Sequence, residues 1–369
     1  MSTLKVDAII DKDGTNTTTI NGQKISASNT SGRNMLINGK FTISQRYGTS
    51  AAAVNATTGI YTIDRWLLYT QSGNYSVQQV SEADQPDGFA NACKVTVSSV
   101  GDSTSSSALA FLEQKIEGYN ISSLNWGGGN TSTPKTCTLS FHVKSSVTGT
   151  YSVHFGNDSD RFYVSTYTIN SANTWEKKTI TLTGPTDGTW NYTTGRGLEI
   201  VFPLVAGSNS TTSSLNSWIS TEDYMSTSSV QWGDNAGATF YLTGVQFEEG
   251  SVATEFEHKK FHEEQIDCFR YYEYFWFDNT TGQRVLVNLG QEYQNRKYLS
   301  PFFFKVEKRA NPTTAAVTFS VDQGDSTFNF TALVSKSFIS FFNNSSSPSI
   351  GSSDIAFSPQ SAIYGDAEL

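Results

Sequence analysis

Tryptophan next to small polar residues is the feature of this sequence with the clearest chemical use. A sugar ring presents an apolar C–H face that stacks on an indole, while nearby Asn, Asp and Gln side chains bond its hydroxyls. Trp126 follows Asn125, Trp190 precedes Asn191, and Trp218 ends a stretch rich in Ser, Thr and Asn. These five residues are the predicted glycan-binding residues.

The alternative is that the indoles belong to a core, because Trp is highly buried on average. We assign Trp66 and Trp232 to the core on this ground. Trp126 and Trp190 are the favoured sugar-contacting rings.

Two histidines lie four residues apart among glutamates, a spacing that would place both imidazoles on one helix face and hold zinc. They are His258 and His262. The metalloprotease pattern requires Glu directly after the first His, where this chain has Lys259. A solvated linker helix is therefore favoured, and no metal site is predicted.

Four carboxylates suggest a glycosidase, in which two carboxyl groups flank the scissile sugar bond. Glu113 and Glu117 share the parity of one strand pattern, and Glu248 and Glu249 end another, so structural or solvated roles are favoured. The stretch 127–129 lacks the Lys and Ser or Thr of a phosphate loop, and no G-x-S-x-G is present. We expect no catalytic residue and no cofactor, hence a protein that is not an enzyme.

Short strand patterns separated by turns fill residues 34–258, and they must position the tryptophans. They are 35–43, 61–69, 75–80, 93–100, 108–116, 136–144, 151–155, 162–169, 178–182, 198–204 and 240–247. No helical pattern of 10–15 residues lies between them, which favours an antiparallel jelly-roll β-sandwich over a parallel sheet. Loops rich in Gly, Asn, Ser and Thr would gather at its ends, where binding residues tend to lie.

The stretch 240–261 marks the end of this domain. Apolar residues on both parities of 240–247 predict a central strand, and a short helix is expected to begin near Lys259. Residues 259–369 then form a smaller β-rich domain. Consecutive phenylalanines at 302–304 and 341–342 put large rings on both strand faces, which suggests contact with another subunit.

Residues 1–33 alternate only weakly and carry little apolar bulk. Two such strands cannot stay folded alone in water, so this β arm is expected to be disordered on its own or to pair with another chain. We predict an attachment or trimer-forming arm.

Composition fits an all-β protein, with 13% aromatic and only 16% charged residues. The net charge of -9 argues against a nucleic-acid partner, because phosphate binding needs clustered Lys and Arg. Three scattered cysteines suggest buried thiols rather than a disulfide framework. Neither a secretory signal nor an apolar run of ~18 residues is seen, so no membrane insertion is expected.

Several segments together resemble bacteriophage virion proteins, especially tail-fibre-like chains. They are NMLINGKFTISQR (34–46), YTIDRWLL (61–68), FLEQKIEGYN (111–120), FYLTGVQFEEGSVATEFEHK (240–259) and CFRYYEYF (268–275), with STLKVDAIIDKDG (2–14), SPFFFKVEKRANPT (300–313) and GDAEL (365–369) completing the set. The resemblance implies a jelly-roll domain like those of carbohydrate-binding modules, followed by a C-terminal β domain. The order and spacing of the segments agree over nearly the whole chain.

The resemblance implies a virion component assembled in the host cytoplasm and released by lysis. The first hypothesis is a homotrimeric tail fibre or receptor-binding protein that adheres to a host surface glycan and docks on other tail or head proteins through its N-terminal arm. The second is a purely architectural virion part, such as a head decoration or tail spacer. The third is a polysaccharide depolymerase.

Overall fold

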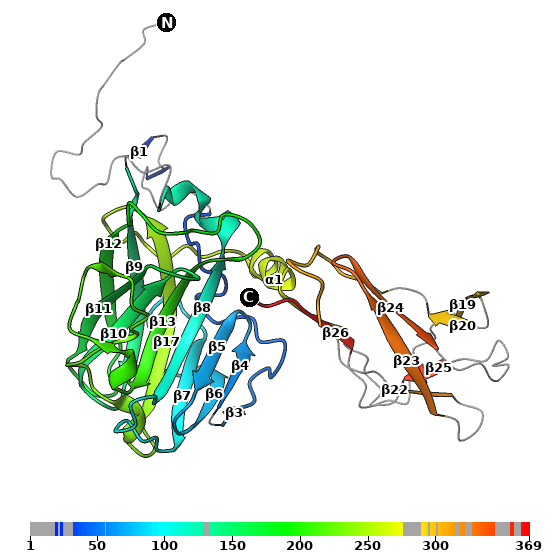
Figure 1. Cartoon of the computed structure of the whole chain (residues 1–369), viewed down its shortest axis with the longest axis horizontal. Coiled ribbons are helices and arrows are strands. Elements are labelled where there is room, and N and C mark those ends of the chain that lie inside the picture. The colour runs from blue at the N-terminus through cyan, green and yellow to red at the C-terminus, as the bar shows by residue number, and fades with distance from the viewer. Residues whose placement is uncertain are drawn as a thin grey trace, which may run out of the picture.

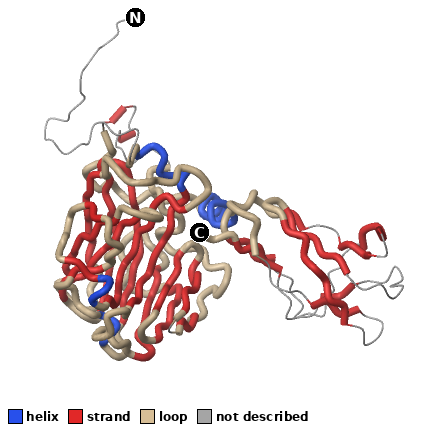
Figure 2. Tube along the Cα trace, viewed as in Figure 1, coloured by secondary structure: helices blue, strands red, loops and turns tan. Residues whose placement is uncertain are grey.

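The computed structural model describes residues 19–20, 23–24, 32–55, 57–127, 133–275, 289–293, 296–299, 302–313, 318–321, 327–343, 355–357 and 363–369. Figures 1 and 2 show a larger and a smaller β region with a short α-helix between them. Within these described ranges, no helix has the length and apolar character needed to span a bilayer.

The larger region consists of two antiparallel sheets packed face to face. One has seven strands in the order β15-β11-β10-β13-β8-β5-β4, and the other has six in the order β12-β9-β17-β7-β6-β3. The first contains β4 (Thr58–Ile63), β5 (Trp66–Thr70), β8 (Leu109–Glu117), β10 (Gly149–Gly156), β11 (Phe162–Ile169), β13 (Arg196–Ala206) and β15 (Trp218–Ile219). The second contains β3 (Ala52–Val54), β6 (Asn74–Val80), β7 (Ala92–Ser99), β9 (Thr136–Ser145), β12 (Glu176–Thr183) and β17 (Thr239–Glu249).

The chain crosses repeatedly between the two sheets, for example from β7 to β8, from β8 to β9 and from β12 to β13. Such crossings between antiparallel sheets make a jelly-roll sandwich, which confirms the predicted fold class. Short 3₁₀ helices η2 (Gly118–Leu124), η3 (Ser208–Ser210) and η4 (Trp232–Asp234) lie in the connections. A small parallel pair, β14 (Thr211–Thr212) and β16 (Met225–Ser226), lies in the connection between β13 and β17.

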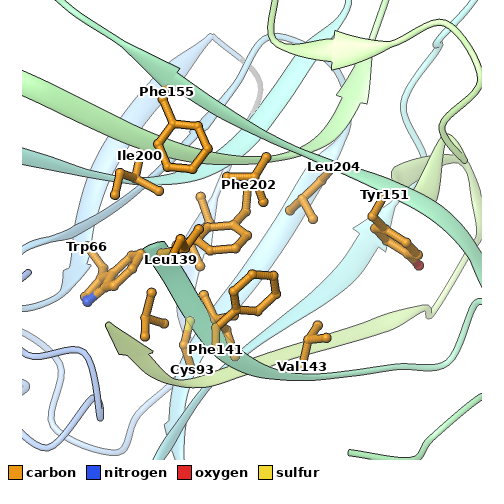
Figure 3. Close-up of a cluster of buried hydrophobic side chains, with 14 of the residues drawn as sticks. Trp66, Cys93, Leu139, Phe141, Val143, Tyr151, Phe155, Ile200, Phe202 and Leu204 are labelled. Carbon is orange, nitrogen blue, oxygen red and sulfur yellow. The ribbon is translucent and has the colours of Figure 1, made fainter. Parts of the chain in front are cut away.

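Alternating side chains of both sheets fill the space between them. Figure 3 shows Phe141 and Leu139 of β9 meeting Phe202 and Ile200 of β13 across this space. Ring centroids of Phe141 and Phe202 lie 5.1 Å apart, edge to face. The three cysteines are buried free thiols, as expected from their spacing.

Strand β17 lies between β9 and β7, as predicted for a central strand. Its residues from Phe240 to Glu248 are buried on both faces. A register shift between Thr243 and Gln246 places Gly244 at a φ of 60°. Phe89 packs against this glycine so closely that a Cβ would clash with its ring.

The predicted helix is α1 (Phe261–Phe269), and Glu263 in its first turn accepts a hydrogen bond from the Lys260 backbone N–H at 3.1 Å. His258 precedes the helix and packs on Phe89 and Phe256 instead. The expectation that His258 and His262 share one helix face is therefore wrong. Within the described ranges no group of three or more His, Cys, Asp or Glu residues is arranged to hold a metal ion.

The C-terminal region is built from short antiparallel strands. They are β18 (Tyr272–Phe275), β19 (Leu289–Tyr293), β20 (Arg296–Leu299), β21 (Phe302–Phe303), β22 (Thr318–Val321), β23 (Thr327–Val334), β24 (Phe338–Asn343), β25 (Ile355–Phe357) and β26 (Ile363–Asp366). Phe303 is 67% exposed and Phe304 is buried. The side chains at 302, 341 and 342, named with them in the subunit-contact prediction, lie outside the described residues.

Within the N-terminal arm, β1 (Thr19–Ile20) and β2 (Gln23–Lys24) pair antiparallel. Most of the remaining arm lies outside the described residues. Its predicted role in attachment or trimer formation therefore stays a prediction.

Buried charges hold helix α1 against the sandwich. The Glu264 carboxylate accepts a hydrogen bond from the backbone N–H of Asn38. Glu117 of β8, with 2% of its side chain exposed, accepts from Nε and Nη2 of Arg270 at 2.8 and 2.6 Å, and from the Tyr271 hydroxyl at 2.8 Å. Three donors thus compensate one buried carboxylate.

The last residues of the chain return to the same place (Figure 1), where two arginines hold them. Arg65 forms a buried ion pair with Glu368, and its guanidinium lies 3.5 Å from the ring centroid of Tyr271. Arg46 pairs with Asp366 at 2.9 Å and with Glu368 at 3.4 Å. Burial alone would lower the pKa of Arg65, but the charge and hydrogen bond of Glu368 together with the nearby Tyr271 and Tyr61 outweigh burial and raise it. We call the residues that fasten helix α1 and the C-terminal residues to the sandwich the joint. They are Asn38, Arg46, Arg65, Glu117, Glu264, Arg270, Tyr271, Asp366 and Glu368.

Segments far apart in the sequence supply the joint. Residues 34–46, 61–68, 111–120, 268–275 and 365–369, all part of the resemblance to virion proteins, each contribute at least one member. Five of the segments that carry the resemblance therefore meet where the two β regions are fastened together.

Candidate functional site

The three tryptophans predicted from the sequence meet at one end of the sandwich. Trp126 follows η2, Trp190 lies between β12 and β13, and Trp218 begins the edge strand β15. Their ring centroids are separated by 5.2 Å (126 to 190), 5.5 Å (126 to 218) and 5.8 Å (190 to 218), with interplanar angles of 83°, 69° and 85°. Each pair is edge to face, the arrangement that aromatic quadrupoles favour.

Burial separates two of these rings from the third. Trp126 is 1% exposed and Trp190 is 9% exposed. Their indole N–H groups donate to the backbone carbonyls of residues 135 and 187, at 2.8 and 3.2 Å. The prediction that Trp126 and Trp190 stack on a sugar is corrected, because both rings belong to the core. The glycines at 184 and 127 leave no room for a Cβ against these rings.

Trp218 is only half-buried and lines an open depression of about 470 Å³. The other lining residues are Arg161, Asp187, Ile219, Ser220 and Thr221. The Trp218 N–H donates to the carbonyl of residue 183 at 2.8 Å, which fixes the orientation of the ring. An oriented indole next to hydroxyls, a carboxylate and a guanidinium has the composition of a sugar-binding surface.

A fork of two hydrogen bonds organises the charged side of this depression. Arg161 donates from Nε and Nη2 to the two carboxylate oxygens of Asp187, at 2.7 and 2.5 Å. The hydrogen bond from Arg161 lowers the pKa of Asp187, so this carboxylate is ionised near neutral pH. Asp187 is 62% exposed and can accept hydrogen bonds from a ligand.

The two predicted asparagines serve local structure. Asn125 ends η2 in the left-handed conformation, with φ of 54°. The side-chain oxygen of Asn191 accepts hydrogen bonds from the backbone N–H and hydroxyl of Thr193, at 2.8 and 2.9 Å. Neither residue is among those that line the Trp218 depression.

A row of rings on the outer face of the seven-stranded sheet was not foreseen. Phe111 stacks between Tyr69 and Tyr224, with centroid distances of 5.1 and 5.2 Å, and Tyr224 also stacks on His154 at 4.7 Å. Because neighbouring rings cover each other's faces, this row is a packed ladder rather than an open platform. Phe111 and Glu113 are two residues apart in one strand pattern, so the sequence already placed this ring and this carboxylate on the same face of the strand.

Two carboxylates beside the ladder have opposite pKa shifts. Burial raises the pKa of Glu113 to about 7, against which its ion pair with Lys115 (3.3 Å) acts only in part. Burial would also raise the pKa of Glu199, but the hydrogen bond from His154 and the charges of His154 and Arg196 outweigh it and lower the pKa. Carboxyl groups tuned in opposite directions are a pattern that acid–base sites share.

The other three carboxylates considered for a glycosidase are dispersed. Glu117 belongs to the joint. Glu248 accepts from Thr254, and Glu249 pairs with Lys135 at 2.8 Å.

No protein-family model and no curated protein matches the chain. Solved structures with a similar fold include the enzymatically active domain of Bacteriophage CBA120 tailspike protein 4 (15% identity, 59% of this chain and 21% of that chain, TM-score 0.32). Others are a putative sugar binding protein from Bacteroides thetaiotaomicron (13% identity, 59% and 100%, TM-score 0.33) and TmCBM61 in complex with β-1,4-galactotriose (10% identity, 59% and 99%, TM-score 0.30).

The chain spans only about a fifth of the tailspike chain. All three identities lie below 25% and all three TM-scores below 0.5. Neither a ligand nor an activity of this chain follows from them, and the strand order itself establishes the sandwich.

Proposed function

We propose that this chain is a structural protein of a bacteriophage particle that adheres to host surface glycans without cleaving them, most specifically a tail fibre or tail-associated receptor-binding protein. The observation that carries the adhesive role is the Trp218 depression, where a half-exposed, oriented indole lies beside Asp187, Ser220 and Thr221. The virion assignment rests on the resemblance of the joint segments and of 240–259 to phage proteins.

Weak sites suit such a role when copies are linked. A single shallow depression binds sugar weakly, on the order of millimolar. Three copies in a homotrimer, docked on other tail or head proteins through residues 1–33, make later contacts intramolecular and raise the avidity.

The test compares the wild-type chain with Trp218→Ala on immobilised bacterial lipopolysaccharide and capsular polysaccharide fractions. We expect the wild type to be retained by at least one fraction, and Trp218→Ala to be retained several-fold less. Tyr47→Ala is the matched control, since it removes a 38% exposed ring at another position. Retention that Trp218→Ala leaves unchanged, or no retention of the wild type by any fraction, would contradict the adhesive role.

The second candidate is an architectural virion component without receptor contact, and the burial of Trp126 and Trp190 favours it. An electron-microscopy map of the particle that places this chain on the capsid, away from the tail tip, would support this candidate. The third candidate is a depolymerase, because Glu113 and Glu199 lie on the paired strands β8 and β13 and their pKa values shift in opposite directions. Release of reducing ends from the bound polysaccharide, lost in Glu113→Gln, would identify that activity.

A further inference from the structure

The outer face of the six-stranded sheet carries two lysines on either side of a tyrosine. Tyr241 of β17 is paired with Lys94 of β7 and with Lys144 of β9. The Lys144 ammonium lies 4.3 Å from the Tyr241 ring and 5.1 Å from the ring of Trp175, and the Lys94 ammonium lies 5.3 Å from Tyr241. Strand pairing therefore fixes both cations and the Tyr241 ring on one face.

Carboxylates from a surface connection cover these cations. Glu82 lies 2.8 Å from Lys144 and 4.0 Å from Lys94, and both oxygens of Asp84 lie 3.0 Å from Lys144. The lysine is the buried partner, with 6% of its side chain exposed, against 31% for Glu82 and 54% for Asp84. The acids therefore reach down from solvent onto a cation that belongs to the sheet.

The connection 81–91 is fastened mainly at its other end. Phe89 packs against His142 and Phe256, with centroids 5.3 and 5.0 Å away. The Asn91 carbonyl accepts a hydrogen bond from the Thr243 hydroxyl at 2.7 Å. The acidic half is held by its ion pairs to the lysines and by the hydrogen bond from the Gln85 side chain to the Val80 carbonyl at 3.1 Å.

The cluster has unused capacity to bind a ligand. The indole N–H of Trp175 is buried and has no hydrogen-bond partner within the part of the chain that the structure describes. Burial would lower the pKa of Lys144, but the hydrogen bonds and charges of Glu82 and Asp84 outweigh it and raise the pKa, so Lys144 is cationic near neutral pH. An indole N–H without a partner, beside a fixed cation, suits the binding of an anionic ligand that contains a ring.

We propose that Lys94, Lys144, Trp175 and Tyr241 form a binding site for a sugar that carries an anionic group, in which the anion takes the place of Glu82 and Asp84. Water reaches the carboxylates of these ion pairs and screens part of their attraction to the lysines. An external carboxylate or sulfate brings the same charge together with a sugar ring that can stack on Trp175. The two acids thus act as an internal competitor. This site is separate from the Trp218 depression and does not depend on it.

Affinity electrophoresis of the full chain in gels containing polygalacturonate, dextran sulfate or neutral dextran tests the site. We expect retardation by at least one of the two charged polymers, weakening with salt, and none by neutral dextran. The two charged polymers distinguish a carboxylate from a sulfate. Glu82→Gln with Asp84→Asn removes the competitor and is expected to strengthen retardation about fivefold, whereas Lys144→Met abolishes it.

Lys135→Met is the matched control, because it removes a lysine paired with a carboxylate (Glu249, 2.8 Å) at the opposite end of β9 and is expected to leave retardation unchanged. Lys94→Met repeats the test at a half-exposed position if Lys144→Met does not fold. Trp218→Ala should retain the binding of charged polymer, which separates this site from the proposed adhesive one. Retardation that does not increase in the Glu82 and Asp84 double variant, or that survives both lysine changes, would overturn the proposal.

Discussion

The joint and the tryptophan end use charge in opposite ways. At the joint, carboxylates whose side chains are almost fully buried are paired with arginines, as with Glu368 and Arg65 or Glu117 and Arg270. At the tryptophan end the buried groups are neutral indoles, and the ion pair between Arg161 and Asp187 has an exposed carboxylate. Buried paired charges specify how two regions fit together, whereas exposed charge beside a ring is free to meet a ligand.

This difference bears on what the resemblance to virion proteins means. Five of the segments that carry it contribute residues to the joint, while Trp126, Trp190 and Trp218 lie outside all of them. The ligand must therefore be inferred from the ends and outer faces of the sandwich.

Breaking the joint should have the largest effect. Arg65→Met leaves the Glu368 carboxylate without its buried partner, which typically costs about 3–5 kcal/mol. We expect the free energy of unfolding, measured by denaturant titration, to fall by that amount. Limited proteolysis should then separate residues beyond 261 from the sandwich.

The double variant Arg65→Met with Glu368→Gln is the control. Because it removes both charges, it should recover part of the lost stability. If the double variant is as unstable as the single one, the ion pair is not what fastens the joint.

At the tryptophan end, we expect one ring to serve stability and another to serve glycan binding. Trp126→Ala removes a core ring and should cost about 3–5 kcal/mol. Trp218→Ala, at a half-buried ring, should lower the free energy of unfolding by less than half as much. Per folded molecule, it should nevertheless weaken glycan retention more than Trp126→Ala does. Thermal unfolding and polysaccharide retention measured on the same samples check the division, and equal stability losses would contradict it.

The fold could be predicted further than the site. Alternation of apolar residues and the turn-rich spacing predicted the sandwich, the central strand at 240–247 and the helix after Lys259, because these features depend on local periodicity. The joint could not be predicted, since Arg65 and Glu368 are about three hundred positions apart and no local pattern links them.

The site was predicted only in part, for a physical reason. The sequence shows which loops carry Trp, and all three predicted rings do meet. Exposure depends on which neighbour covers a ring, and Trp126 is covered by the two other tryptophans and by Phe247 from the end of β17. Only Trp218, on a two-residue edge strand, keeps part of its surface.

Strand β8 carries one buried carboxylate with several hydrogen-bond donors and another with few, so the effect of compensating a buried charge can be measured there. Glu117 has three donors, whereas Glu113, four residues earlier on β8, has one cation at 3.3 Å. The pKa of Glu113 is raised from 4.5 to about 7. Between these values the folded protein holds a proton that the unfolded chain has released, so stability falls as pH rises through this window.

The expected loss is about 3 kcal/mol, since each pKa unit is worth about 1.36 kcal/mol. Glu113→Gln should remove this loss, and the difference between the two proteins should appear in denaturant titrations from pH 4.5 to 8. Parallel pH profiles for the two proteins would contradict the assignment.

The smallest effect on stability is expected at the exposed fork, where the effect on binding is what distinguishes the two regions. Arg161→Gln releases Asp187, which is already 62% exposed, so the unfolding midpoint should not change measurably. Glycan retention should nevertheless fall about tenfold, because Asp187 is no longer held beside Trp218. Lys135→Met removes another exposed pair and should change neither quantity. A shift in the midpoint for Arg161→Gln alone would mean that this fork, like the joint, serves the fold rather than the ligand.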